Sequence, residues 1–133
     1  MTIQRINPDT MHKNPAFTQV ATVTNPSKWI FVGGQNGVDA TGKVVGKDIG
    51  SQTEQAYKNV ITALEAAGAT LNDVFKMTIY LVEGQSLQAG FAAVQKVHQT
   101  QPQPVAPPTV SMMMVAGLAN PDYLIEIEAV AVV

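Results

Sequence analysis

The ten residues at the C-terminal end form the most restrictive pattern in this sequence. In residues 124–133, LIEIEAVAVV, apolar side chains alternate with two glutamates and then with small or β-branched residues. Because alternate side chains of a strand share a face, Glu126 and Glu128 point one way while Ile125 and Ile127 point the other. The glutamate face fits a sheet surface exposed to water. It also fits a cleft in which one carboxylate acts as a general base or a hydrogen-bond acceptor.

Two helices and further strands precede this tail. The segment Ser51–Glu54, SQTE, has the spacing of a capping box and predicts the start of a helix that Gly68 ends. A second helix is predicted to begin after Ser86 and to end before the proline-rich loop at 102–108. Two amphipathic helices need one face of a sheet to bury against, which leaves the other face to water or to another subunit. The strands are expected at residues 4–7, 16–24, 28–33, 73–83, 109–115 and 123–133.

The composition is poor in charge for a soluble chain. Charged residues make up 14% of the 133 residues and hydrophobic ones 46%, whereas roughly 25% charged is typical of soluble domains. We therefore expect one domain, residues 1–133, that buries part of its apolar surface in an oligomer. The formal net charge is −2 and the basic residues do not cluster. This argues against nucleic-acid binding, whose affinity comes from neutralising phosphates.

Residue types that are missing or widely spaced exclude several kinds of site. No cysteine is present, so disulfides, thiolate zinc sites and cysteine nucleophiles are excluded. His12 and His98 lie far apart and lack the spacing of metal ligands, so no metal is expected. The N-terminus has no apolar signal core, and no apolar run reaches membrane-spanning length. These features predict a soluble cytoplasmic protein without a membrane partner.

Motifs along nearly the whole chain resemble those of the Rid family, also called YjgF-like. The resemblance rests on the order of the predicted elements and on short segments of sequence. These are Gly34-Gln35, Thr53-Glu54-Gln55-Ala56, Glu65-Ala66-Ala67-Gly68 with Asp73-Val74, Val115-Ala116-Gly117-Leu118 and Ile125-Glu126-Ile127-Glu128-Ala129. The resemblance implies an α+β subunit of chorismate-mutase-like fold. It also implies a mixed six-stranded sheet with two helices on one face, and clefts between the subunits of a homotrimer.

The same resemblance implies an activity and places candidate site residues. Active members, the reactive-intermediate deaminases, hydrolyse enamines and imines released by pyridoxal-phosphate enzymes, giving a keto acid and ammonia without cofactor or metal. Their glutamate that helps place the attacking water falls on Glu126, and Glu128 is expected to be structural. The glycine that lines the cleft falls on Gly34, beside Gln35. An aromatic near the N-terminus falls on Phe17, where a tyrosine is common.

One position departs from the family pattern. Active members have an arginine that clamps the substrate carboxylate, and that position is Val110 in this chain. Val110 and Met112 share a strand face, so the wall that would hold a carboxylate is apolar. An arginine fork supplies two charge-assisted hydrogen bonds of about 1.5–3 kcal/mol each, so its loss should cost more than about 100-fold for amino-acid-derived imines. Arg5, His12 or Lys13, in the N-terminal segment that borders the cleft in this family, is a candidate substitute.

Three functions are compatible with these observations, and the sequence does not decide whether the chain is an enzyme. The first is a Rid-type hydrolase of an enamine, an imine or a related metabolite, in which the glutamate positions a water molecule. Its substrate would lie against Val110, Met112 and Phe17 and would not be a short 2-imino acid. The second is a non-catalytic trimer that binds a small metabolite or a protein in the inherited clefts. The third is a ribonuclease or translation inhibitor, against which the acidic net charge counts.

Overall fold

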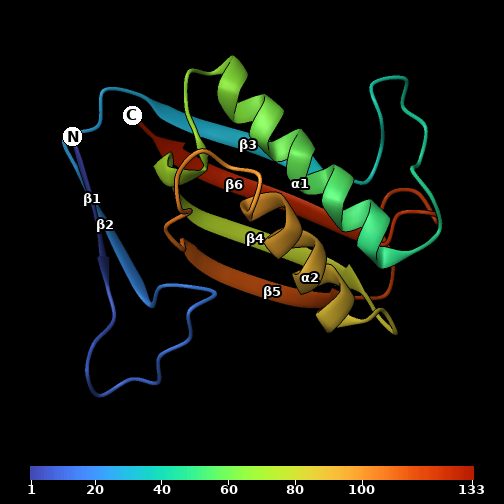
Figure 1. Ribbon diagram of the computed structural model, residues 1–133, viewed down its shortest axis with the longest axis horizontal. Helices are drawn as coiled ribbons and strands as arrows, with labels where there is room; N and C mark the ends of the chain where they lie inside the picture. The colour runs from blue at the N-terminus through green and yellow to red at the C-terminus, as the bar shows by residue number, and fades with distance from the viewer.

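The chain forms six strands and two α-helices in the predicted order, with one short 3-10 helix that was not predicted (Figure 1). The computed structural model describes all residues 1–133. The elements are β1 (Thr2–Ile6), β2 (Val20–Thr24), β3 (Trp29–Gln35), α1 (Ile49–Ala66), η1 (Leu71–Asp73), β4 (Val74–Val82), α2 (Leu87–His98), β5 (Thr109–Val115) and β6 (Ile125–Val132). Neither α-helix is both long and apolar enough to cross a membrane.

The strands lie in two sheets, which differs from the single six-stranded sheet that we expected. The main sheet has the order β3-β6-β4-β5. Within it β4 and β5 run parallel, and the other neighbours are antiparallel. β1 and β2 form a separate antiparallel hairpin. The α+β fold class is therefore confirmed, while the six strands are divided into groups of two and four.

A turn and two side-chain hydrogen bonds hold the hairpin away from the edge of the main sheet. Asn25 has a positive φ of 52°, which asparagine tolerates, and its turn with Pro26 redirects the chain between β2 and β3. The guanidinium of Arg5 donates to the carbonyls of Asn72 and Val74, each at 3.0 Å. The hairpin is thereby attached at the start of β4 and does not continue alongside β3 (Figure 1).

The first helix begins earlier than the predicted capping box. Its N-cap residue is Asp48, whose carboxylate accepts a hydrogen bond from the backbone N–H of Ser51 at 2.8 Å. This bond holds the pKa of Asp48 below its usual value. Aspartate is as good an N-cap residue as serine, so the helix already starts at Ile49. The strand expected from residue 16 is also shorter, because β2 begins at Val20.

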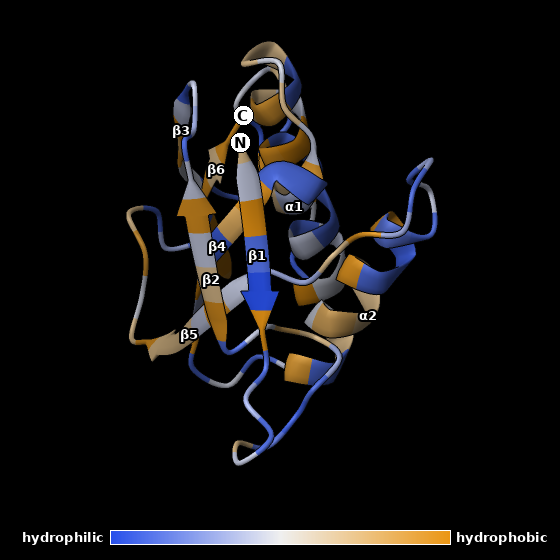
Figure 2. Cartoon of the chain, turned by 90° about the vertical axis from the view of Figure 1, so that its left-hand side faces the viewer, coloured by the Kyte–Doolittle hydropathy of each residue, from blue (hydrophilic) through white to orange (hydrophobic).

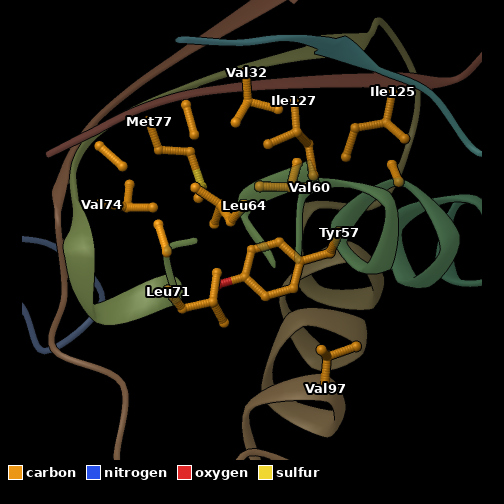
Figure 3. Close-up of a cluster of buried hydrophobic side chains, with 14 of the residues drawn as sticks. Val32, Tyr57, Val60, Leu64, Leu71, Val74, Met77, Val97, Ile125 and Ile127 are labelled. Carbon is orange, nitrogen blue, oxygen red and sulfur yellow. The ribbon is translucent and has the colours of Figure 1, made fainter. Parts of the chain in front are cut away.

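The core lies between the two helices and one face of the main sheet. Figure 2 shows both helices on the same side of the sheet. Figure 3 shows side chains of α1 packed among those of β3, β4 and β6. Val60, Leu64 and Ile127 are 0% exposed, and burial of a side chain of this size stabilises the fold by about 1.5–3 kcal/mol. The helices therefore cover one sheet face, as predicted.

The other face of the main sheet, called the open face below, carries aromatic and charged side chains. Its residues alternate along each strand with the buried ones, as the pleat requires. Trp29 and Phe31 are 52% and 75% exposed there. The open face comprises Trp29, Phe31, Gly33, Lys76, Thr78, Tyr80, Ser111, Met113, Glu126, Glu128 and Val130.

Candidate functional site

Glu126, the predicted catalytic carboxylate, lies on the open face at the beginning of β6. Its neighbours Ile125 and Ile127 are 3% and 0% exposed, so strand alternation directs the Glu126 side chain away from the core. Glu126 is paired across the sheet with Tyr80 of β4. The residue is half-buried, which leaves its carboxylate accessible to a ligand or to water.

Asn36 holds this carboxylate from the end of β3. Its amide Nδ2 donates to the carbonyl of Ile125 at 2.9 Å and to Oε1 of Glu126 at 3.3 Å. The carbonyl of Asn36 accepts in turn from Nδ2 of Asn59 in α1 at 3.2 Å. The same Asn59 amide donates to the carbonyl of Val38 at 2.9 Å. A helix that packs on the other face of the sheet thus fixes the residue that positions Glu126.

The Gly-Gln turn brings backbone without a side chain against the same carboxylate. A Cβ at Gly34 would lie 2.5 Å from Oε2 of Glu126, a distance that requires something to shift. Glycine therefore allows a close approach here. The register shifts between Val32 and Gln35, which marks a β-bulge of the kind often found beside functional sites. The Gln35 side chain folds back, and its Nε2 donates to the carbonyl of Gly33 at 3.0 Å.

Glu128 lies beside Glu126 on the open face but has a different partner. The hydroxyl of Tyr80 donates to Oε1 of Glu128 at 3.1 Å. This hydrogen bond, with smaller contributions from desolvation and the two carboxylate charges, raises the pKa of Tyr80. The phenol therefore stays protonated as a donor, while Oε2 of Glu128 has no protein partner.

Gln52 of α1 fixes the start of β6 and was not among the predicted residues. Its side chain is 0% exposed. Its Nε2 donates to the carbonyls of Gly46 at 3.0 Å and Asp122 at 2.9 Å, and its Oε1 accepts from the N–H of Leu124 at 2.9 Å. A signal for this role was present, because Gln52 occupies the buried stripe of the helix, where a polar side chain needs partners.

The predicted apolar wall lies on the other side of the sheet. Val110 and Met112 occupy alternate positions of β5 and are paired with Met77 and Ile79, which pack into or against the core. They therefore stand on the opposite sheet face from Glu126. Val110 packs against the core, and Met112 is 47% exposed on the edge strand.

Phe17 lies in the segment between β1 and β2, near the start of β5. The neighbouring Thr18 donates from its backbone to the carbonyl of Pro108 at 2.9 Å and from its hydroxyl to the carbonyl of Pro107 at 2.7 Å. His12 packs edge-on against Phe17, with ring centroids 6.0 Å apart. Within one chain the predicted residues thus form two separate groups, one around the catalytic glutamate and one around β5.

Two of the three candidate substitute cations already have partners. Arg5 donates to the carbonyls that attach the hairpin, and burial lowers the pKa of its guanidinium. Lys13 pairs with Asp9 at 3.0 Å. Only His12 contacts a predicted site residue, the aromatic ring of Phe17. No group of three or more histidine, aspartate or glutamate residues is placed to hold a metal ion.

Sequence comparisons place the chain among proteins of one family. The profile of the Endoribonuclease L-PSP family matches residues 11–133. A RutC family protein from Pyrococcus horikoshii is 39% identical over 104 residues, which cover 77% of this chain and 78% of that protein. The 2-iminobutanoate/2-iminopropanoate deaminase of Mus musculus is 33% identical over 104 residues, covering 77% of this chain and 73% of the enzyme.

Solved structures lead to the same family. YyfB from Yersinia pestis, a Rid protein of unknown function, matches with a TM-score of 0.86 and 30% identity over 100% of both chains. The YjgF protein of E. coli matches with a TM-score of 0.71 and 30% identity, over 82% of this chain and 84% of its own. Since the family profile spans most of the sequence and the fold agrees, the chain belongs to the Rid (YjgF-like, Endoribonuclease L-PSP) family.

Proposed function

We propose that the chain is a hydrolase of an imine, an enamine or a related metabolite, and that Glu126 positions the attacking water. The observation that carries this proposal is the arrangement around the Glu126 carboxylate. Asn36 donates to Oε1, and the missing side chain of Gly34 lets Oε2 lie close against the backbone of the β3 bulge. A half-buried carboxylate held in this way suits a general base. Relatives named 2-iminobutanoate/2-iminopropanoate deaminase support imine chemistry.

The proposed reaction balances with water as the only co-reactant. Glu126 accepts a proton from water as the water oxygen attacks the imine carbon, and the nitrogen takes up a proton from solvent. The adduct is a carbinolamine, in which the former imine carbon carries a hydroxyl group and an amino group. Protonated Glu126 then gives its proton to the nitrogen, the C–N bond breaks, and the hydroxyl loses its proton to solvent. The products are a carbonyl compound and ammonia.

The substrate we propose differs from the short 2-imino acids. The position where active family members carry the carboxylate clamp is Val110, which packs against the apolar core and offers no donor. A carboxylate placed there would lose its hydration and would find no hydrogen-bond donor or positive charge in its place. The proposed substrate therefore has no carboxylate at this point and makes apolar contact with β5.

The complete site in this proposal forms between subunits of a cytoplasmic homotrimer. Within one chain, the residues around Glu126 and those around β5 lie on opposite faces of the sheet, so a neighbouring subunit is needed to combine them. The exposed aromatic surface of Trp29 and Phe31 supports burial of the open face in an assembly. The low content of charged residues supports it too.

A non-catalytic binding module is the second candidate, and one observation favours it. The apolar Val110 replaces the group that active members use to hold their substrate, while Gly34, Gln35 and Glu126 match the family pattern. Such a trimer would bind a small metabolite or a protein without turnover. The ribonuclease or translation-inhibitor function has less support, because the eight basic residues do not gather into a patch for phosphates.

The experiment compares ammonia release from two imines produced in the reaction vessel. An amino-acid oxidase acting on alanine supplies 2-iminopropanoate, and a flavin amine oxidase acting on benzylamine supplies benzaldimine, which has no carboxylate. The wild type, Glu126→Gln and Val110→Arg are compared. Glu65→Gln is the matched control, because Glu65 is an exposed carboxylate on α1, on the helix side of the sheet.

The wild type should accelerate hydrolysis of benzaldimine more than that of 2-iminopropanoate, and Glu126→Gln should abolish the acceleration. Val110→Arg should raise the rate on 2-iminopropanoate if the cleft is an inherited deaminase site. If the wild type accelerates neither reaction and Glu126→Gln changes nothing, the hydrolase proposal is wrong and the binding module replaces it. If the mass measured under native conditions is that of a single chain, the proposal of a site between subunits is wrong.

A further inference from the structure

The edge strand β5 carries a row of apolar side chains on its helix side. Val110, Met112 and Met114 occupy alternate positions of β5, and their partners in β4 pack into or against the core. The three side chains therefore share the sheet face opposite the open face, and they are called the β5 strip below. Val110 packs against the core, whereas Met112 and Met114 are each 47% exposed.

The β5 strip begins at the proposed reaction site. Val110 occupies the position at which active family members hold the substrate carboxylate, a group attached to the imine carbon. Met112 and Met114 follow on the same face of the strand. At about 3.3 Å per residue, the strip leads about 13 Å away from Val110. A substrate whose imine carbon is bound near Val110 thus has an apolar surface beside it over this length.

The start of α2 lies at the far end of the β5 strip. β4 ends at Val82, whose partner in β5 is Val115, and α2 begins soon afterwards at Leu87. Figure 1 shows the start of α2 near the ends of these two parallel strands. Leu87 and Phe91 are one helical turn apart and are 48% and 50% exposed. The helix therefore brings further apolar side chains to the end of the sheet at which the strip finishes.

The side chains of the β5 strip favour an uncharged, flexible ligand. None of them is charged, and a thioether sulfur is only a weak hydrogen-bond acceptor. Methionine is unbranched and adapts to irregular apolar shapes. An unbranched hydrocarbon can lie along such a row, whereas a carboxylate or an ammonium group would lose its hydration there.

The β5 strip does not depend on access to the open face. In the proposed trimer the neighbouring subunits bury the open face, and the strip lies on the opposite face of the sheet. The proposed cleft joins the group around Glu126 of a neighbour to the strip at its Val110 end. Met112 and Met114 are then left for the part of the substrate that extends beyond the reacting group.

We propose that the β5 strip holds an unbranched aliphatic chain on the imine carbon, so that the substrate is a long-chain aldimine or its enamine tautomer. This inference rests on the proposed hydrolase function. Hydrolysis of such a substrate releases ammonia and a long-chain aldehyde. An extended hydrocarbon advances by about three bonds for each residue of extended backbone. A chain of about six carbons therefore reaches Met112, and one of about ten carbons comes within reach of Met114.

The test measures ammonia release from imines of different chain length, with the rate in the absence of the protein subtracted. A flavin amine oxidase produces the imines from propylamine, hexylamine and decylamine, and benzaldimine is the reference. Full burial of one methylene changes an equilibrium about fourfold, and contact on one side should give about half of that free energy, or about twofold. For the wild type, kcat/KM should rise about eightfold from the propyl to the hexyl imine and further for the decyl imine.

Substitutions along β5 locate the chain. Met112→Gln should lower kcat/KM about fourfold for the hexyl and decyl imines and leave the propyl imine unchanged. Met114→Gln should lower it for the decyl imine only. Met112→Leu and Met114→Leu keep the apolar surface and should retain the dependence on chain length. Met113→Gln is the matched control, because Met113 is 43% exposed but lies on the open face. The mass of every variant is measured under native conditions.

Three outcomes would overturn the inference while the hydrolase function stands. The first is acceleration of benzaldimine hydrolysis without any dependence of the alkyl imines on chain length. The second is an equal effect of Met113→Gln and Met112→Gln on that dependence. The third is a change in subunit number for Met112→Gln or Met114→Gln with an unchanged dependence on chain length, which would show that the strip is a contact between subunits.

Binding of unreactive alcohols separates the inference from the hydrolase function. If no imine is hydrolysed faster than without the protein, the hydrolase function is wrong, and ligand-observed NMR with propan-1-ol and hexan-1-ol decides on the strip. Tighter binding of hexan-1-ol by the wild type, lost in Met112→Gln and kept in Met112→Leu, would support an apolar chain on β5. Equal binding of the two alcohols would overturn it.

Discussion

The two faces of the main sheet are made by the same strands but differ in almost every physical respect. On the helix side, β6 contributes Ile125, Ile127 and Ala129, none of them more than 3% exposed. On the open face, the same strand contributes Glu126 and Glu128, both half-buried and both accepting side-chain hydrogen bonds. The pleat of one strand thus separates the groups that stabilise the fold from those available for binding and chemistry.

The treatment of polar groups shows the same difference. On the helix side, the buried side chain of Gln52 has three hydrogen bonds, so its burial costs little. On the open face, Lys76, Thr78 and one oxygen of Glu128 lack protein partners. A surface that retains such free capacity is suited to a ligand or to another subunit. On the helix side, one buried hydroxyl, that of Thr53, lacks a hydrogen-bond partner.

The largest expected effect comes from truncating a side chain on the helix side. Leu64→Ala removes a residue that is 0% exposed, and the lost burial and the cavity should lower the free energy of unfolding by about 2–5 kcal/mol. Phe31→Ala on the open face should change the free energy of unfolding of a separated subunit by no more than about 0.5 kcal/mol, because Phe31 is 75% exposed within one chain. In the proposed trimer the loss should be larger, because the open face is buried there. Urea unfolding of the separated subunit measures both variants, and equal losses there would remove this difference between the faces.

The next effect concerns the two adjacent glycines of the β3 bulge. Gly34→Ala builds a methyl group 2.5 Å from Oε2 of Glu126, so the carboxylate must move away. Because this carboxylate ends a flexible side chain, we expect the free energy of unfolding to change by no more than about 1 kcal/mol, but any Glu126-dependent hydrolysis to be lost. Gly33→Ala is the matched control, because a Cβ there meets nothing within 4 Å. Unfolding curves and ammonia release measure the two variants. If the two variants have the same stability and the same hydrolysis rate, the close contact between Gly34 and Glu126 affects neither property.

Asn36 connects the helix side of the sheet to the open face, because it contacts both Asn59 of α1 and Glu126. Its substitution should have a smaller effect on the hydrolysis rate than that of Gly34. Asn36→Ala removes the donor to Glu126 Oε1, so the unfolding free energy should fall by about 1 kcal/mol and the hydrolysis rate by about tenfold. In a Glu126→Gln background, the rate effect should vanish while the stability loss remains. A rate loss that persists there would mean that Asn36 does not act through Glu126.

The helix side was largely predictable because its signals are local. The helical spacing of Tyr57, Val60 and Leu64, which are buried along α1, is visible in the sequence, and the alternation at Ile125 and Ile127 predicted the core face of β6. These patterns follow from the helical and strand periods alone. Gln52 lies on the same buried stripe of α1, so its helical position also predicts a buried polar side chain that needs hydrogen-bond partners.

The parts that were not predicted depend on contacts between distant segments. The separation of the hairpin rests on Arg5 reaching the carbonyls of Asn72 and Val74, and no local pattern encodes that. Asn36 and Tyr80 gained their roles from the strands that lie beside theirs. The resemblance to a family indicated Glu126, but the groups that hold its side chain become visible only in three dimensions.

The smallest expected effect tests a polar contact within the helix layer. The hydroxyl of Tyr57 in α1 lies 2.6 Å from Nε2 of His98 in α2, and burial raises the pKa of Tyr57 and lowers that of His98. Tyr57 is therefore the donor, and the neutral imidazole is the acceptor. Because the pKa of His98 in the folded protein lies below its unfolded value of about 6.5, protonation favours unfolding.

This contribution to stability is complete above about pH 6.5 and is lost as the pH falls through that value towards the lowered pKa of the folded state. The melting temperature of the wild type should thus fall between pH 7.5 and pH 5.5 by more than that of His98→Gln, whose amide accepts a hydrogen bond but does not titrate. The corresponding difference in the free energy of unfolding should stay below about 1 kcal/mol, because His98 is only partly buried and solvent screens its charge. Parallel pH profiles for the two proteins would show that the contact between Tyr57 and His98 does not respond to pH in this range.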